Sequence, residues 1–192
     1  MGWDWTLFRM ANGLAGRSHL LDTLVRFVMN DYWATTMLVL LPFGLWFSGN
    51  SESERERNQK GVLSTVMALA MANLVVKVIN LLYWRWRPFT HHDVTLLFYH
   101  PSDSSFPSNA ATVGFCIAAS VLLFNRRTGL VLLLIACLFS VSRVVGGVHY
   151  PTDILGGLII GSASAWLVQR QWRWPDRLWA PLLRWLRRLV LA

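Results

Sequence analysis

The sequence has few charged residues for its length. Only 15% of its 192 residues are Asp, Glu, Lys or Arg, whereas 54% are hydrophobic. A soluble domain with so few charges could not cover its surface with polar groups. The apolar residues occur in blocks, and eleven Trp accompany them, a residue type that concentrates at membrane–water interfaces. The composition therefore favours a polytopic helical membrane protein with one domain.

Cysteine is scarce as well, and a signal-peptide core is missing. Cys116 and Cys137 both lie inside apolar runs, where cysteine usually acts as a small buried apolar residue. Neither a disulfide nor a thiol nucleophile is indicated. Asp4 and Arg9 interrupt any early apolar core, so the pattern does not predict a cleavable signal peptide.

Acidic residues are outnumbered by basic ones, ten to eighteen, which gives a net charge of +8. The basic residues gather in loops and in the segment after the last apolar stretch, not in a soluble groove or a recognition helix. This distribution is typical of membrane topology and not of nucleic-acid binding. We therefore expect the lipid bilayer, and no nucleic acid, as a partner.

Five apolar stretches are near the length needed to cross a hydrocarbon core about 30 Å thick. The sequence therefore predicts an all-α bundle of about five to six membrane helices within one domain, residues 1–192. Residues 1–31 are expected to form interfacial amphipathic helices broken near Gly13 and Gly16, with an apolar face, and residues 170–192 a basic interfacial tail. Residues 51–57 are interpreted as a solvated loop, and the Gly157/Gly161 pair predicts close helix packing within the bundle. The five stretches are 32–48, 62–83, 108–124, 129–147 and 153–169, and the apolar face comprises Leu20, Leu21, Leu24, Phe27 and Val28.

The basic residues predict the orientation of these stretches. Eleven of the eighteen Lys and Arg fall on one side, which is the cytoplasmic side by the positive-inside rule. Segments 84–107 and 148–152 then lie on the extracytoplasmic side. The eleven residues are Arg55, Arg57, Lys60, Arg126, Arg127, Arg170, Arg173, Arg177, Arg184, Arg187 and Arg188.

The residue types of a phosphate site occur around segment 148–152, at the extracytoplasmic ends of the two stretches that flank it. Ser142 and Arg143 are followed by His149 and, four residues later, by Asp153. An arginine can hold an anion, a histidine can attack it, and a carboxylate can orient the histidine. The alternative is a structural Arg–Asp pair with a surface histidine, which is disfavoured because ionisable residues here meet at span ends on one side.

Two further segments on that side have residues that can bind phosphate. Arg85 and Arg87 stand just before Pro88, where a planar guanidinium can bind two phosphate oxygens; snorkelling to lipid headgroups is the alternative. Ser108 and Asn109 follow Pro107 at the start of an apolar stretch, where a helix N-terminus could bind an anion; an ordinary N-cap is the alternative.

Together the three segments resemble the signature motifs of the type 2 phosphatidic acid phosphatase superfamily. The resemblance covers roughly residues 5–170. With Leu96, Leu97, His100, Asp103 and the Ser105–Ser108 stretch, it is most similar to bacterial undecaprenyl-diphosphate phosphatases. The resemblance implies hydrolysis of a prenyl diphosphate to the monophosphate at the extracytoplasmic face of the bacterial inner membrane. Alternatives are a phosphatidylglycerophosphate or phosphatidate phosphatase, or a non-catalytic protein that binds lipid phosphates.

The resemblance also implies residue roles, without a metal or other cofactor. His149 would form a phosphohistidine and Asp153 would orient it. The phosphate oxygens would be held by Arg87, Arg143, Ser108 and Asn109. Where the first motif usually has a lysine, this chain has Asn80, so that Lys77 or Arg85 is the candidate to supply that charge.

The second motif of the superfamily ends in a histidine that handles the leaving-group proton, and this chain has Ala110 there. Alanine cannot transfer a proton. We therefore predict phosphate binding and slow phosphorylation of His149, but poor turnover. Two explanations stay open: a deliberate inactivating substitution, which the intact remaining motifs favour, and a natural pseudoenzyme.

Overall fold

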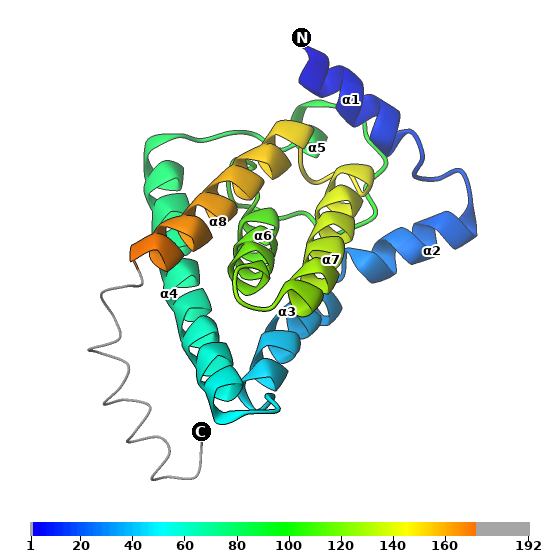
Figure 1. Cartoon of the computed structure of the whole chain (residues 1–192). Coiled ribbons are helices and arrows are strands. Elements are labelled where there is room, and N and C mark those ends of the chain that lie inside the picture. Colours follow the sequence, from blue (N-terminus) through cyan, green and yellow to red (C-terminus); the bar gives the residue numbers. More distant parts are fainter. Residues whose placement is uncertain (1, 172–192) are drawn as a thin grey trace.

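The computed structural model describes residues 2–171, which form eight α-helices and no strand (Figure 1). This result confirms the all-α prediction for the described part of the chain. Most of the predicted basic tail, from residue 172 onward, lies outside the described residues. The helices are α1 (Trp3–Asn12), α2 (His19–Val28), α3 (Asp31–Trp46), α4 (Glu52–Leu82), α5 (Pro88–His91), α6 (Asn109–Leu122), α7 (Arg126–Val145) and α8 (Pro151–Gln171).

A helix is found at each of the five predicted apolar stretches. Of these helices α4, α7 and α8 are long and apolar enough to cross a membrane, whereas α6 is apolar but has only 14 residues. Helix α3 has 16 residues and contains Pro42. The chain is thus a multi-pass helical membrane protein, and the count of five to six spans stays a prediction.

The prediction of a loop at residues 51–57 is wrong, because residues 52–57 are the first turns of α4 and Ser51 is its N-cap. The Ser51 hydroxyl caps the helix by accepting a hydrogen bond from the Glu54 backbone N–H at 3.2 Å. Lys60 pairs with Glu56 one turn away at 3.1 Å. A cap and charge pairs at helical spacing stabilise a helix in water, so the alternating charges belong to a helix that extends beyond the apolar stretch.

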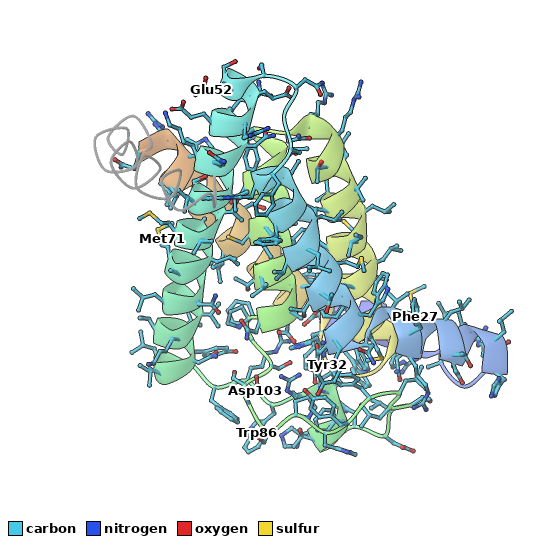
Figure 2. The ribbon with its side chains drawn as sticks, turned by 90° about the horizontal axis from the view of Figure 1, so that it is seen from below. Phe27, Tyr32, Glu52, Met71, Trp86 and Asp103 are labelled. Atoms are coloured by element: carbon cyan, nitrogen blue, oxygen red, sulfur yellow. The ribbon has the colours of Figure 1, made fainter. Side chains whose placement is uncertain are left out.

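Helices α1 and α2 lie on either side of Gly13 and Gly16, where the sequence predicted two pieces. On α2 the side chains of Leu20, Leu24 and Phe27 are exposed, while Val25 is buried against the rest of the protein. Figure 2 shows α2, which carries Phe27, projecting from the side of the bundle. Its outward apolar face suits the predicted interfacial position, which stays a prediction.

Helix α6 occupies the centre of the bundle, between α4, α7 and α8 (Figure 1). Two glycines of α8 allow it to approach α6 closely. A Cβ atom at Gly157 would lie 2.8 Å from the Ala111 Cβ, and one at Gly161 would lie 2.5 Å from the Thr112 carbonyl oxygen. The predicted packing role of this glycine pair is confirmed, and it places the beginnings of α6 and α8 side by side.

Candidate active site

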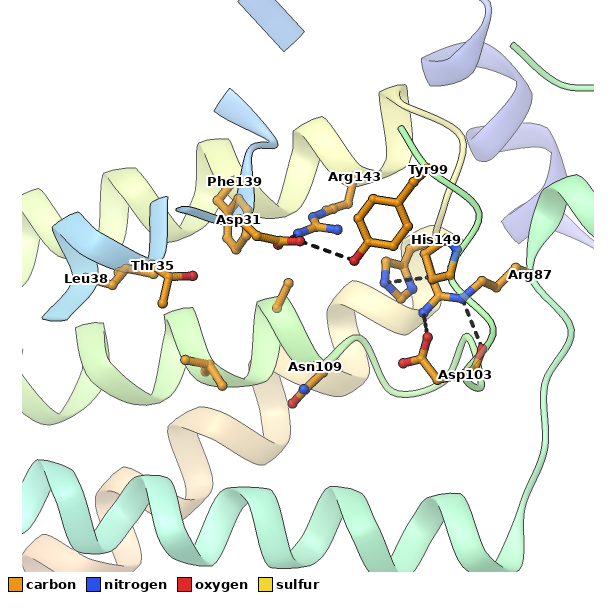
Figure 3. A pocket seen from close by; sticks show the side chains of 13 residues that line it. Asp31, Thr35, Leu38, Arg87, Tyr99, Asp103, Asn109, Phe139, Arg143 and His149 are labelled. Atoms are coloured by element: carbon orange, nitrogen blue, oxygen red, sulfur yellow. Dashed lines mark hydrogen bonds and ion pairs between the residues drawn. The ribbon is translucent and has the colours of Figure 1, made fainter. Parts of the chain in front are cut away.

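A cavity of about 330 Å³ lies at the end of the bundle where α6 begins. Figure 3 shows that its walls come from α3, α6 and α7 and from the loops on either side of α5. Five of the residues singled out in the sequence meet in its lining, from all three motifs. They are Arg87, Asn109, Ala110, Arg143 and His149; the other lining residues are Asp31, Thr35, Leu38, Tyr99, Pro101, Asp103, Val113 and Phe139.

The turn between α7 and α8 presents His149 to this cavity. Gly147 adopts φ +86°, and a Cβ atom there would lie 2.9 Å from the Thr95 carbonyl oxygen, so the turn requires glycine. The side chain of His149 is buried. Its Nδ1 lies 3.0 Å from the Ser105 carbonyl oxygen, and its Nε2 lies 3.2 Å from Nη1 of Arg87. Because a carbonyl can only accept, Nδ1 carries the proton and Nε2 keeps a lone pair toward Arg87.

Asp153 takes part in the orientation of His149, but not alone. Its Oδ2 is 3.5 Å from His149 Nδ1, farther than the Ser105 carbonyl. The same oxygen accepts hydrogen bonds from the Ser105 hydroxyl at 2.5 Å and from the Tyr150 backbone N–H at 2.8 Å. Asp153 therefore binds both the Ser105 side chain and the backbone next to His149. The Ser105 carbonyl is the nearer partner of the ring.

Burial lowers the pKa of His149, and the positive charges of Arg87 and Arg143 act in the same direction. The hydrogen bond and negative charge of Asp153 oppose this shift without cancelling it. A lowered pKa keeps the imidazole neutral at neutral pH. The neutral form is the one that can attack phosphorus.

We expect His149 to titrate below its ordinary value of 6.5. As the pH falls through 6.5, the nucleophile should therefore stay neutral in the folded protein and become protonated only at lower pH. Nitrogen NMR of labelled protein in detergent measures the midpoint, and a peptide of residues 145–153 supplies the unperturbed reference. A midpoint at or above that of the peptide would contradict the buried, arginine-flanked position.

The two arginines of the cavity are both buried and both face carboxylates. Arg87 donates to Oδ1 of Asp103 at 2.8 Å and to the Val148 carbonyl oxygen at 3.0 Å. Arg143 forms an ion pair with Asp31. Its guanidinium also stacks on Phe98 and Phe139, at 4.5 and 4.8 Å from the ring centres, and its buried Nε has no hydrogen-bond partner. A phosphate oxygen could satisfy that donor.

Sequence reasoning missed two carboxylates of this site. Asp103 was part of the resemblance but had no role, and Asp31 was not considered. A signal for Asp31 existed, since it directly precedes the predicted stretch 32–48, at the end that the basic residues predict to be extracytoplasmic. The Tyr99 hydroxyl lies 3.5 Å from Asp31 (Figure 3), so the loop before α6 also contributes to this wall.

Three predicted phosphate ligands do not line the cavity. Arg85 is paired with Asp4 and Asp153, each at 2.6 Å, so its guanidinium is already occupied. Lys77 is exposed on α4. The Ser108 hydroxyl caps α6 by accepting from the Ala111 backbone N–H at 3.4 Å, which is the ordinary N-cap alternative. We therefore propose no phosphate contact for these three side chains.

The helix N-terminus that the sequence predicted near Pro107 is present in the structure. Helix α6 starts at Asn109 with Ser108 as its N-cap, one residue after Pro107. The N-terminus itself reaches the cavity, through Asn109 and Ala110. Such a terminus carries free N–H donors and the positive end of the helix dipole, which favours a bound anion.

The cavity combines a buried histidine, two buried arginines and a helix N-terminus within a helical membrane bundle, an arrangement that suits the binding of a phosphate group. Residues 61–177 match the PAP2 superfamily. Undecaprenyl-diphosphatase BcrC of Bacillus subtilis (strain 168) is 30% identical over 168 residues, which cover 87% of this chain and 83% of that protein. The chain therefore belongs to the PAP2 superfamily, which confirms the resemblance.

Two further similarities agree with this assignment. The putative undecaprenyl-diphosphatase YbjG of Escherichia coli (strain K12) is 31% identical over 169 residues, 88% of this chain and 82% of that protein. The crystal structure of Aquifex aeolicus LpxE has a TM-score of 0.72 at 25% identity, and the match covers 88% of this chain and 96% of that one.

Proposed function

We propose that this chain acts on a prenyl diphosphate, converting it to the monophosphate through a phosphohistidine, and that turnover is slow because Ala110 replaces the proton-transferring histidine. The observation that supports this most is the His149 imidazole, whose unprotonated Nε2 faces Arg87 in the cavity that Arg143 also lines. The named relatives BcrC and YbjG, an undecaprenyl-diphosphatase and a putative one, support the substrate class.

In the proposed reaction His149 Nε2 attacks the terminal phosphorus. The Nε2–P bond forms as the bridging P–O bond breaks, and the lipid monophosphate leaves. Arg87, Arg143 and the N-terminus of α6 stabilise the negative charge on the equatorial oxygens. Water then cleaves the N–P bond and releases inorganic phosphate, a step that needs a base.

Ala110 lies in the wall of the same cavity and has only a methyl group to present. It can neither protonate a leaving oxygen nor activate water. A lipid monophosphate is a good leaving group and needs little acid, so phosphorylation of His149 suffers less than the second step. The phosphorylated intermediate should therefore accumulate.

The proposed orientation of the protein in the membrane is supported by the difference between the two ends of the bundle, one of which has the basic segments and the other the cavity. Glu52 lies at one end, and Trp86 and Asp103 lie at the other, beside the cavity (Figure 2). The loop between α6 and α7 belongs to the Glu52 end, since a Cβ at Gly61 would lie 2.5 Å from Phe124. The basic residues of these segments favour a cytoplasmic location, and we therefore propose that the cavity faces the extracytoplasmic side of a bacterial inner membrane.

Two other functions have specific support. A phosphatidylglycerophosphate or phosphatidate phosphatase is suggested by the PAP2-type phosphatidylglycerolphosphate phosphatase of Bacillus subtilis, which matches with a TM-score of 0.59 at 25% identity over 86% of this chain and 82% of that chain. The other function, non-catalytic binding of lipid phosphates, has Ala110 as its one supporting observation, because alanine cannot transfer a proton.

Phosphorylation of the unaltered chain tests the proposal. We expect detergent-solubilised protein incubated with terminally ³²P-labelled undecaprenyl diphosphate to acquire acid-labile label, because phosphohistidine is unstable in acid, and labelled phosphatidate to give less. His149→Gln, which keeps a polar side chain, should acquire none. Absence of label on the unaltered chain would support the binding protein, and stronger labelling by phosphatidate would support the other phosphatase.

A further inference from the structure

Helix α1 is attached to the catalytic motif by a chain of ion pairs that begins at Asp4. Nη2 of Arg85 lies 2.6 Å from Oδ2 of Asp4, and Nη1 lies 2.6 Å from Oδ1 of Asp153. Asp4 also accepts from the Thr152 backbone N–H at 3.0 Å and from its hydroxyl at 2.7 Å. The carboxylate of α1 therefore contacts both the arginine that holds Asp153 and the residue before Asp153.

The rest of α1 is fixed against the same region. Asp4, Phe8 and Asn12 share one helix face by their spacing of four residues. Phe8 is fully buried and lies 5.5 Å from the Tyr150 ring. The Asn12 amide donates to the Val145 carbonyl oxygen at 2.9 Å. Figure 1 shows α1 next to α5 at the end of the bundle where α8 begins, so Asp4 is held in place along the whole length of its helix.

The charges of the Asp4, Arg85 and Asp153 ion pairs suit the positive charge that develops on His149 during the proposed reaction. The Asp153 side chain has no exposed surface, and a buried carboxylate needs a partner charge. Arg85 supplies it, but alone it would cancel the negative charge that Asp153 offers to the imidazole. Asp4 offsets Arg85, so that Asp4, Arg85 and Asp153 together carry one negative charge. That charge stabilises the positive imidazole that develops as His149 attacks phosphorus.

We propose that Asp4 and Arg85 are positioning residues, through which α1 orients Asp153 and maintains its negative field at His149. This inference rests on the proposed phosphohistidine reaction. It assigns to α1 a role beyond membrane contact, and to Arg85 a role different from phosphate binding. Neither residue touches the substrate in this scheme, and both act through Asp153.

The test uses the full chain carrying Ala110→His, with hydrolysis of undecaprenyl diphosphate in detergent as the assay. Asp4→Asn should lower kcat about tenfold, the lower end of the range found for groups that orient metal-binding histidines, and leave KM within about twofold. Asp4→Glu should recover most of the rate. Asp22→Asn, the same substitution on α2 outside this ion-pair chain, should leave the kinetics unchanged.

A second measurement separates this role from a purely structural one. In Asp4→Asn the loss of a negative charge should move the NMR titration midpoint of His149 further down, and Asp22→Asn should leave it unchanged. This readout needs no turnover, so it applies even if Ala110→His proves inactive and the proposed function fails. An unchanged His149 midpoint in Asp4→Asn would overturn the inference. A raised KM with an unchanged kcat would also overturn it, because that result would indicate that Arg85 contacts the substrate.

Discussion

Replacement of Ala110 by histidine is expected to raise hydrolysis of undecaprenyl diphosphate by at least about tenfold, a cautious part of the 10²–10⁴-fold that general acid–base catalysis contributes. Ala110 and His149 line the same cavity, so an imidazole at position 110 would share that cavity with the nucleophile. It could protonate the leaving oxygen and afterwards activate water. Release of inorganic phosphate from detergent-solubilised protein measures the gain.

The matched control is Ala110→Asn, which adds a polar side chain of similar reach without a proton that titrates near neutral pH. Its rate should stay at that of the unaltered chain. The gain from histidine should be larger for phosphatidate than for the diphosphate, because an alkoxide leaving group needs the acid more. An Ala110→His protein that binds phosphate but hydrolyses no faster would show that the defect lies elsewhere.

Replacement of Arg87 by alanine in the Ala110→His protein is expected to lower kcat by about 10²–10³-fold, the usual cost of one donor to a developing negative charge. Nη1 of Arg87 lies 3.2 Å from the attacking nitrogen, so the guanidinium is placed to contact the transferred phosphoryl group. Arg87→Lys should recover only part of the rate, because an ammonium keeps the charge but not the two-pronged geometry.

Arg87 also binds the Val148 carbonyl, so loss of folding must be separated from loss of catalysis. Thermal unfolding of each variant in detergent makes that distinction. Arg126→Ala at the start of α7, remote from the cavity, serves as the control and should retain full activity. A well-folded Arg87→Ala protein that loses less than about tenfold in kcat would exclude a direct role in phosphoryl transfer.

Much of the site could be predicted because its motifs are local. Arg143 and His149 lie on either side of the short turn between α7 and α8. Their closeness therefore follows from the local sequence. The prediction was less successful for charges with distant partners. Arg85 had two charged neighbours that no spacing indicates, and residues 51–57 were interpreted as a loop because charge was given more weight than helix capping.

The sequence by itself determined the membrane class, the apolar stretches and the three motifs, and it predicted that Ala110 stands where the superfamily has a histidine, since hydropathy and local spacing need no knowledge of packing. Only the tertiary structure decided which groups meet. The Ser105 carbonyl reaches His149 across 44 positions, Asp31 reaches Arg143 across 112, and Asp4 reaches Thr152 across 148. These contacts depend on how closely α8 packs on α6 and where α1 docks, and such distances follow from side-chain packing between helices that are remote in sequence.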